Sequence, residues 1–404
     1  MMKTLANYST LLSAAFLIVL ASCSPALPAL PPAVTTESAQ VPAEPAPAVE
    51  TDAPLASEPA PTGWDVEVVA EGLEVPWSII FTSPDRMLVS ERKGTIRVIQ
   101  DGILESQPAY VFEDITSQDE AGLMGLALDP AYDANGWFYA CYATRDGSTP
   151  VNRVVRLRDE GEALALDAIL LDGIPSARFH AGCRIRFGPD GKLYLTSGDA
   201  LDGPAAQDLG SLAGKILRMN PDGSVPEDNP FPGSLVYSYG HRNPQGLDWH
   251  PQTGMLYATE HGPSGFDGAP GGDEINLITA GGNYGWPLVS HDRTLEGTLP
   301  PLIQFTPAEA PGSGMFYTAG QLPMFTGSYF FGALRGEGLV QVVFDAADPS
   351  RVLAVEKVVT DVGRVRDVAQ GPDGLLYFST SNRDGRGRPQ AGDDRIYRLV
   401  PVFD

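Results

Sequence analysis

The chain has 404 residues, and its 51 acidic against 27 basic side chains give a formal net charge of −24 at pH 7. So acidic a chain is a poor partner for nucleic acid or for an anionic membrane surface, because like charges repel. Residues 64–404 are rich in Val, Leu, Tyr, Gly and Pro, and this stretch is long enough to form one large core.

The N-terminus is typical of a secretion signal followed by a lipid attachment site. An apolar run over residues 11–20 is too short to span a bilayer with margin, and the small residues of LASC follow it, ending at Cys23. That pattern fits a bacterial lipobox, in which the cysteine is diacylated. We therefore predict a signal peptide over residues 1–22, lipidation at Cys23 and an extracytoplasmic protein anchored to the cell envelope by lipid alone. An ordinary signal peptide with a coincidental cysteine is the alternative.

Residues 23–63 are expected to form a tether between the anchor and the folded part. This segment consists mainly of Pro, Ala, Glu and Thr and has almost no large apolar side chains. It cannot bury enough apolar surface to offset the entropy lost on ordering, so we predict that it is disordered. The folded domain is expected over residues 64–404.

A turn-plus-strand phrase recurs through the folded region. Each copy places Pro or Gly at a hairpin turn and then alternates apolar residues with the period of a strand. Self-similar all-β units spaced by tens of residues are typical of a propeller. We predict an all-β, six-bladed β-propeller with four-stranded antiparallel blades. The copies cover residues 83–89, 129–139, 188–194, 250–257 and 371–377, with a weaker one at 325–330.

The two ends of the folded region are expected to close the ring. Residues 64–69 and 395–400 both alternate apolar and polar side chains as strands do. If they pair in one shared blade, no sheet edge is left open there.

The histidines point to a site. Four of the five lie between residues 180 and 261, and three of these, His180, His241 and His261, stand in glycine-rich polar surroundings beside or between predicted strands. We expect all three to face the central channel, because loops at one end of a rigid scaffold commonly carry function.

At these segments the chain resembles the soluble aldose dehydrogenases of the glucose/sorbosone dehydrogenase family, over residues 72–401. Each stretch alone is weak, but their joint order and spacing are specific. The resemblance implies oxidation of aldose sugars at the anomeric carbon with pyrroloquinoline quinone (PQQ) and Ca²⁺, and electron delivery to a quinone, a cytochrome or a dye-like acceptor. The stretches are EAGLMG (120–125), FHAGCR (179–184), FGPDG (187–191), LAGKILR (212–218), GHRNPQG (240–246), EHGP (260–263), DEINL (273–277), GGNYGWP (281–287) and GRVRDV (363–368).

The resemblance assigns catalytic roles to His180 and Arg242. His180 matches the general base that takes the hydroxyl proton, a step open to an imidazole near neutral pH. Arg242 and Asn243 match residues that contact the quinone oxygens, where a guanidinium stabilises developing negative charge. Glu120 also matches a position beside the cofactor, where a related glucose enzyme has Gln.

PQQ carries three carboxylates, so its pocket needs fixed cations in an otherwise acidic chain. Arg364 and Arg366 match the family's carboxylate-binding pair, and two residues apart on a strand they point to the same face. Arg335 stands where the family often has Lys, which keeps the charge and changes the geometry.

Oxygen ligands for calcium are implied at two places. The backbone carbonyls of Gly262 and Pro263 match ligands of the cofactor's Ca²⁺, and Glu274 with Tyr284 matches a second, structural site. Carbonyl and carboxylate oxygens are the ligands that Ca²⁺ accepts in flexible geometry.

Phe179 marks a departure from the glucose-specific branch, which has an acidic residue there to orient the catalytic histidine. Another group must then hold His180, and a broad-specificity aldose enzyme is expected.

An oxidising compartment would also permit a Cys141–Cys183 disulfide, which sequence alone leaves open. Two other functions remain as alternatives: a calcium-dependent propeller lactonase, and a non-catalytic surface propeller that binds glycan or protein.

Overall fold

The computed structural model describes residues 60–161 and 163–403. The expected signal peptide, the lipidation site at Cys23 and nearly all of the expected tether lie outside these residues. Within them, the structure has no helix whose length and apolar character would allow it to cross a membrane.

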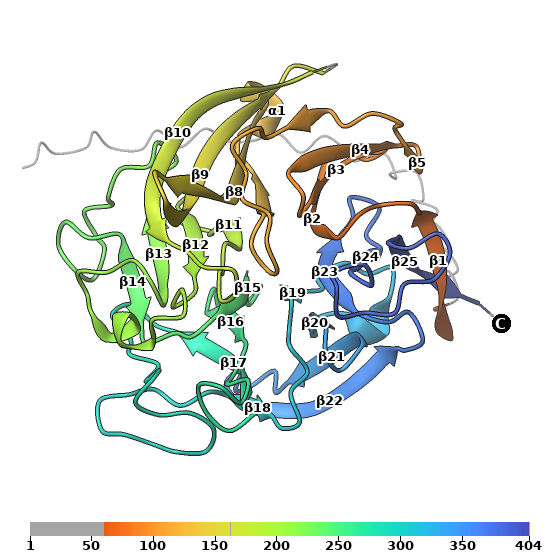
Figure 1. The fold of residues 1–404 in the computed structure, drawn as a ribbon. Coiled ribbons are helices and arrows are strands. Elements are labelled where there is room, and N and C mark those ends of the chain that lie inside the picture. The colour runs from red at the N-terminus through yellow and green to blue at the C-terminus, as the bar shows by residue number, and fades with distance from the viewer. Residues whose placement is uncertain (1–59, 162, 404) are drawn as a thin grey trace, which may run out of the picture. The chain divides into compact units, whose positions relative to one another are not determined.

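Six antiparallel sheets surround a central channel, so the predicted six-bladed propeller is confirmed (Figure 1). Blades 1 and 2 consist of β2 (Pro76–Ser83), β3 (Arg86–Glu91), β4 (Thr95–Gln100) and β5 (Ile103–Leu104), then β7 (Leu123–Leu128), β8 (Trp137–Asp146), β9 (Thr149–Asp159) and β10 (Leu164–Pro175). Blades 3 and 4 consist of β11 (Ile185–Phe187), β12 (Leu193–Ser197), β13 (Lys215–Met219) and β14 (Val236–Tyr239), then β15 (Pro244–Trp249), β16 (Leu256–Glu260), β17 (Asp273–Ile278) and β18 (Ile303–Phe305). Blades 5 and 6 consist of β19 (Met315–Phe316), β20 (Tyr329–Ala333), β21 (Gly338–Phe344) and β22 (Val352–Val359), then β23 (Val365–Gln370), β24 (Leu376–Thr380), β25 (Ile396–Val402) and β1 (Gly63–Ala70).

Few other elements interrupt the blades. A short strand, β6 (Tyr110–Val111), pairs with β4 and gives blade 1 a fifth strand. Among the described residues, the helical pieces are a single α-helical turn and two 3₁₀ turns: α1 (Tyr132–Asn135), η1 (Gly203–Gln207) and η2 (Pro323–Phe325).

The recurring turn phrases all connect the first and second strands of a blade. In blade 3 the carboxylate of Asp190 accepts a hydrogen bond from the Tyr194 hydroxyl at 3.0 Å. Blade 6 repeats this bond between Tyr377 and Asp373 at 2.7 Å. Gly191 has φ +70°, a left-handed conformation that glycine adopts without strain. The sequence repeat is thus a repeat of turn chemistry.

The ring closes as predicted, with β1 as the outermost strand of blade 6. It pairs antiparallel with β25, so that Trp64 lies opposite Pro401 and Val68 opposite Tyr397. The carboxylate of Asp394, just before β25, accepts a hydrogen bond from the Val75 backbone N–H at 3.0 Å. The N-terminal strand therefore joins the two ends of the domain and covers the edge of β25.

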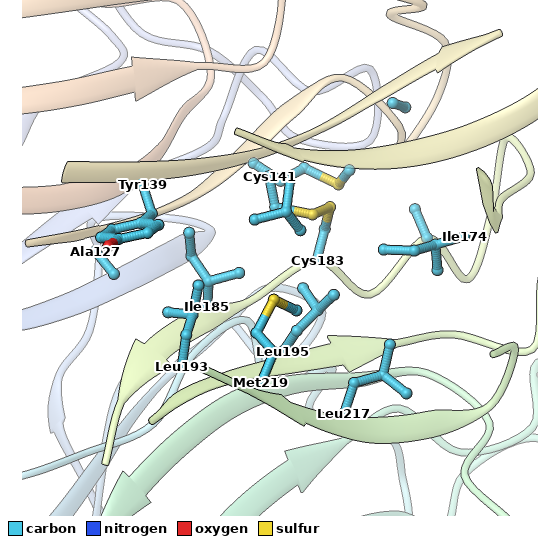
Figure 2. Packing of buried hydrophobic residues seen from close by; sticks show 14 of the residues in the cluster. Ala127, Tyr139, Cys141, Ile174, Cys183, Ile185, Leu193, Leu195, Leu217 and Met219 are labelled. Carbon is cyan, nitrogen blue, oxygen red and sulfur yellow. A yellow bond between two sulfur atoms is a disulfide. The ribbon is translucent and has the colours of Figure 1, made fainter. Parts of the chain in front are cut away.

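Cys141 and Cys183 form a disulfide, which answers the question that the sequence left open. Cys141 lies in β8 of blade 2, and Cys183 lies in the segment before β11 of blade 3. Figure 2 shows the bridge among buried side chains that include Ile174 and Leu195. The disulfide therefore attaches the segment before β11 to blade 2. His180 lies in this segment, three residues before Cys183.

Candidate active site

A pocket of about 600 Å³ opens on one face of the propeller. The first strand of a blade begins at this face and the second strand ends at it. Loops from several blades therefore meet there. It brings together seven of the residues predicted from sequence: Glu120, His180, Gly262, Pro263, Arg335, Arg364 and Arg366.

The opposite end of the channel has its own cavity of about 520 Å³. That cavity is lined by residues of the first strands and contains none of the predicted site residues.

His180 is held by a buried carboxylate. Its side chain is 5% exposed, and its Nδ1 lies 2.7 Å from Oδ1 of Asp199. The second oxygen of Asp199 accepts a hydrogen bond from the Trp286 indole N–H at 2.8 Å. Nε2 of His180 has no hydrogen-bond partner within the described part of the chain, and His180 is one of the residues that line the pocket. A carboxylate at Nδ1 favours the tautomer that leaves Nε2 able to accept a proton, so His180 is a candidate general base.

Asp199 supplies the carboxylate that Phe179 cannot supply. It follows β12, just as His261 follows β16 and Arg335 follows β20. Sequence reasoning missed Asp199 because it searched beside the histidine in the chain. Polar residues directly after the second strand of a blade were the sequence signal that could have identified Asp199.

The backbone around His180 is strained. His180 and Cys183 have φ of +58° and +72°, which costs a non-glycine residue about 1–3 kcal/mol each. Gly182 lies between them, and a Cβ there would lie 2.6 Å from the backbone nitrogen of Gly198. The disulfide and close backbone packing hold this conformation, which places the imidazole at the pocket.

Glu120 binds the His180 segment from the other side. Its carboxylate accepts the backbone N–H of His180 at 3.1 Å and a guanidinium N–H of Arg386 at 3.0 Å. Burial raises the pKa of Glu120, but the neighbouring charges of His261, Arg386 and His180 outweigh burial and lower it to about 2. Glu120 is therefore an anion that supports the site.

Four arginines line the pocket: Arg335, Arg364, Arg366 and Arg386, the last of which is paired with Glu120. Arg364 is buried and held by Asp384 at 2.7 Å, while Arg335 is exposed. Arg366 donates to Oε1 of Gln245 at 2.5 Å, and its buried Nε has no partner in the described structure. Burial lowers the pKa of Arg366 to about 9. Arg364 and Arg366, which are two residues apart at the start of β23, line the same pocket, as their spacing predicts.

Three predicted residues do not reach this pocket. His241, expected to face the channel, is fully buried between Glu260 and the Ser238 hydroxyl, so that expectation is wrong. Asn243 is also fully buried, and its Oδ1 accepts the backbone N–H of Gly182 at 3.1 Å. Arg242 is 2% exposed, because residues 261–267 surround its guanidinium.

The four predicted calcium ligands lie around one small cavity of about 20 Å³. Gly262, Pro263, Glu274 and Tyr284 line it together with Glu260, which is the cross-strand partner of Glu274. The residues that the sequence assigned to two ions therefore share this cavity, while Glu274 and Tyr284 also line a second cavity of about 20 Å³.

The cavity combines oxygen groups of the kind that bind a hard cation with the positive charge of Arg242, which also lines it. Burial raises the pKa of Glu274 to about 8, and the negative charges of Glu260 and Asp273 add to the effect. Nearby, the buried Oδ1 of Asn276 has no partner in the described structure. The described residues contain no group of three or more His, Cys, Asp or Glu side chains placed to hold a metal, so carbonyl oxygens would have to complete the ligand set.

The fold and the pocket define a six-bladed propeller with a carboxylate-held histidine and several arginines at one channel mouth. The chain belongs to the Glucose / Sorbosone dehydrogenase family, whose model matches residues 73–397. It is thus an oxidoreductase of the sugar dehydrogenase type.

Individual relatives cover nearly all of the described domain. The aldose sugar dehydrogenase YliI of Escherichia coli K12 is 31% identical over 351 residues, which cover 80% of this chain and 92% of the relative. A glucose dehydrogenase-type oxidoreductase of Thermus thermophilus is 44% identical with TM-score 0.77, covering 84% of this chain and 100% of that one. The PQQ-bound aldose sugar dehydrogenase of Streptomyces coelicolor is 37% identical with TM-score 0.73, covering 84% and 99%.

Proposed function

We propose that this protein oxidises aldose sugars at the anomeric carbon to lactones, using PQQ and Ca²⁺. One observation carries the proposal: His180, with Nδ1 bound to Asp199 and Nε2 free, lies in a pocket that several arginines also line. The PQQ bound by the Streptomyces coelicolor relative supports the choice of cofactor.

The cofactor has a suitable binding surface in the pocket. When bound, PQQ supplies the acceptor for the hydride that leaves the anomeric carbon. Arg366 and Arg335 would pair with its carboxylates, because guanidinium groups bind carboxylates strongly. Arg364, whose guanidinium already contacts Asp384 and the Leu334 carbonyl, would contribute its charge and its remaining N–H donors. The unpaired Nε of Arg366 supports this role, since a buried donor without a partner gains most from an anionic ligand.

The protein's own part in the chemistry is to move one proton. Nε2 of His180 takes the proton of the anomeric hydroxyl as the hydride departs. Asp199 keeps the other ring nitrogen protonated and stabilises the imidazolium that forms, while Trp286 holds Asp199. Arg242 and Asn243 remain proposed cofactor contacts, and Arg242 would stabilise negative charge on the quinone oxygens once accessible.

We assign the calcium ligands to the small cavity beside the pocket. The carbonyls of Gly262 and Pro263, with Glu274 and Tyr284, would supply oxygen ligands there. The cation would relieve the repulsion between Glu260 and Glu274 and act as a Lewis acid toward the quinone.

The location and electron acceptor complete the proposal. The disulfide fits an extracytoplasmic compartment, where such bonds persist, and we propose lipid anchoring through Cys23. Electrons would pass to a quinone, a cytochrome or a dye-like acceptor.

Cys23→Ala should release the protein from the membrane fraction, and a variant that stays bound after a high-salt wash would exclude the lipid anchor.

Reconstitution of the full chain tests the enzymatic proposal. Apo-protein should reduce an artificial dye with aldoses only after both PQQ and Ca²⁺ are added, and a chelator present during loading should suppress the activity. A panel of aldoses then defines the substrate range. Activity with NAD alone, or lactone hydrolysis without any dehydrogenase activity, would overturn the proposal in favour of another function; no activity of either kind would favour a binding protein.

A further inference from the structure

A short exposed segment, residues 264–268, covers part of the site. It follows Pro263 and contains Phe266, a large apolar side chain that is 66% exposed. The Phe266 ring stacks on the His180 imidazole, with 5.8 Å between ring centroids and 19° between ring planes. An exposed phenylalanine over the candidate base has no role in the chemistry described above.

The same segment occupies Arg242. Asp267 accepts a hydrogen bond from Nε of Arg242 at 2.7 Å, and Oγ of Ser264 accepts one from Nη2 at 3.2 Å. The backbone carbonyl of His261 accepts a third, from Nη1, at 3.1 Å. Every nitrogen of this guanidinium therefore already has an oxygen partner from residues 261–267, which is why Arg242 does not reach the pocket.

We infer that residues 264–268 are a displaceable cover in which Asp267 competes with an anionic ligand for Arg242, while Phe266 shields His180. The inference rests on the proposed function, because it takes PQQ as the anion. Cofactor binding replaces the Asp267 carboxylate at Arg242 with the quinone oxygens of PQQ and moves Phe266 off the imidazole. The base is then uncovered only when the hydride acceptor is in place.

The contacts of the segment are suited to such an exchange. The Asp267 side chain is 17% exposed, and besides Arg242 it is held by the backbone N–H of Ser264 at 2.9 Å. Gly265 has φ +98°, and a Cβ at that residue would meet no atom within 4 Å, so the turn stands free of the blades. Segments with few buried contacts open at low cost. Arg242, by contrast, remains fixed because its backbone N–H is bound by Glu260.

Asp267→Asn in the full chain tests the competition. It keeps the size of the side chain but removes the charge that neutralises Arg242, so affinity for PQQ, measured by titration with Ca²⁺ present, should rise roughly ten- to a hundredfold. Glu337→Gln is the matched control, because it removes a carboxylate that lines the pocket without freeing Arg242. Its effect on PQQ affinity should stay within about threefold.

Hydrogen exchange of residues 264–268 provides a readout that is independent of turnover. In the parent protein the Ser264 amide, the one backbone N–H of this segment with a hydrogen-bond acceptor in the described structure, should exchange more slowly without PQQ than with it, whereas in Asp267→Asn it should be fast in both states. Asp267→Ala should behave in the same way, which guards against a specific effect of the amide. Slower exchange on PQQ binding, or a gain in affinity no larger than that of Glu337→Gln, would overturn the inference. If PQQ binds none of these proteins, the proposed function itself fails.

Discussion

Asp199→Asn should separate the orientation of His180 from every other property of the site. The carboxylate uses both oxygens: Oδ1 receives the Nδ1–H of His180 at 2.7 Å and the Leu201 backbone N–H at 2.9 Å, and Oδ2 receives the Trp286 N–H at 2.8 Å. An asparagine has only one acceptor oxygen, so its NH₂ group must face either the Trp286 N–H or both His180 and the Leu201 N–H. In both orientations the negative charge beside the imidazole is lost, and in the second the imidazole proton also moves to Nε2.

Without that charge Nε2 is a weaker base, because the imidazolium that forms is no longer stabilised, and in the second orientation Nε2 already carries the proton it should accept. We expect turnover at saturating PQQ and sugar to fall by roughly 10²–10⁴, the usual contribution of general-base catalysis and of a correctly held tautomer. This corresponds to about 3–5 kcal/mol of transition-state stabilisation. Affinity for PQQ and the KM for sugar should change little, because Asp199 contacts neither the arginines of the pocket nor its mouth.

The assay is dye-linked turnover of reconstituted protein, with PQQ affinity and thermal unfolding measured on the same preparations. Trp286→Phe is the control, since it removes only the second hydrogen bond of Asp199 and keeps an aromatic ring near Arg242. It should cost less than about tenfold in turnover. An Asp199→Asn protein that binds PQQ normally and keeps turnover within about threefold of the parent would refute the role of Asp199.

Two further predictions concern the cofactor and the scaffold. Arg366→Ala should weaken PQQ binding by roughly ten- to a hundredfold, while saturating PQQ should restore most of the turnover. The reason is that a contact with a cofactor carboxylate stabilises the ground state and the transition state equally. A loss of turnover that saturating PQQ cannot restore would contradict this prediction. Replacing Cys141 and Cys183 together by Ser should lower the free energy of unfolding by about 4 kcal/mol, from the entropy of a 42-residue loop. Denaturant titration measures this effect, and a change below about 1 kcal/mol would show that the bridge adds little.

The sequence predicted the fold because its information is local. The Pro and Gly of each turn, and the Asp–Tyr bond seen at Asp190 and Asp373, fix a hairpin within a few residues. Six such hairpins leave few architectures to choose from. The strand order within each sheet and the pairing of β1 with β25 then follow from the short connections and from the need to cover an edge.

The site was predicted less completely, because its contacts join residues far apart in the chain. Asp199 reaches His180 across 19 positions, and Asp267 reaches Arg242 across 25. Neither pairing leaves a periodic or short-range pattern in one sequence. Motif spacing predicted a cofactor contact for Arg242, but it could not show that the Asp267 carboxylate of the same chain is bound to that guanidinium.

The closing strand also determines where attachments to the domain emerge. Arg364 and Arg366, at the start of β23, line the pocket, and strand direction alternates through β24, β25 and β1. The end of β25 at Val402 and the start of β1 at Gly63 therefore lie together at the opposite face. A linker added at either position leaves from the side away from the pocket. An enzyme immobilised on an electrode through such a linker would expose its pocket to dissolved sugar, and electrons would have to reach the electrode by a diffusing mediator.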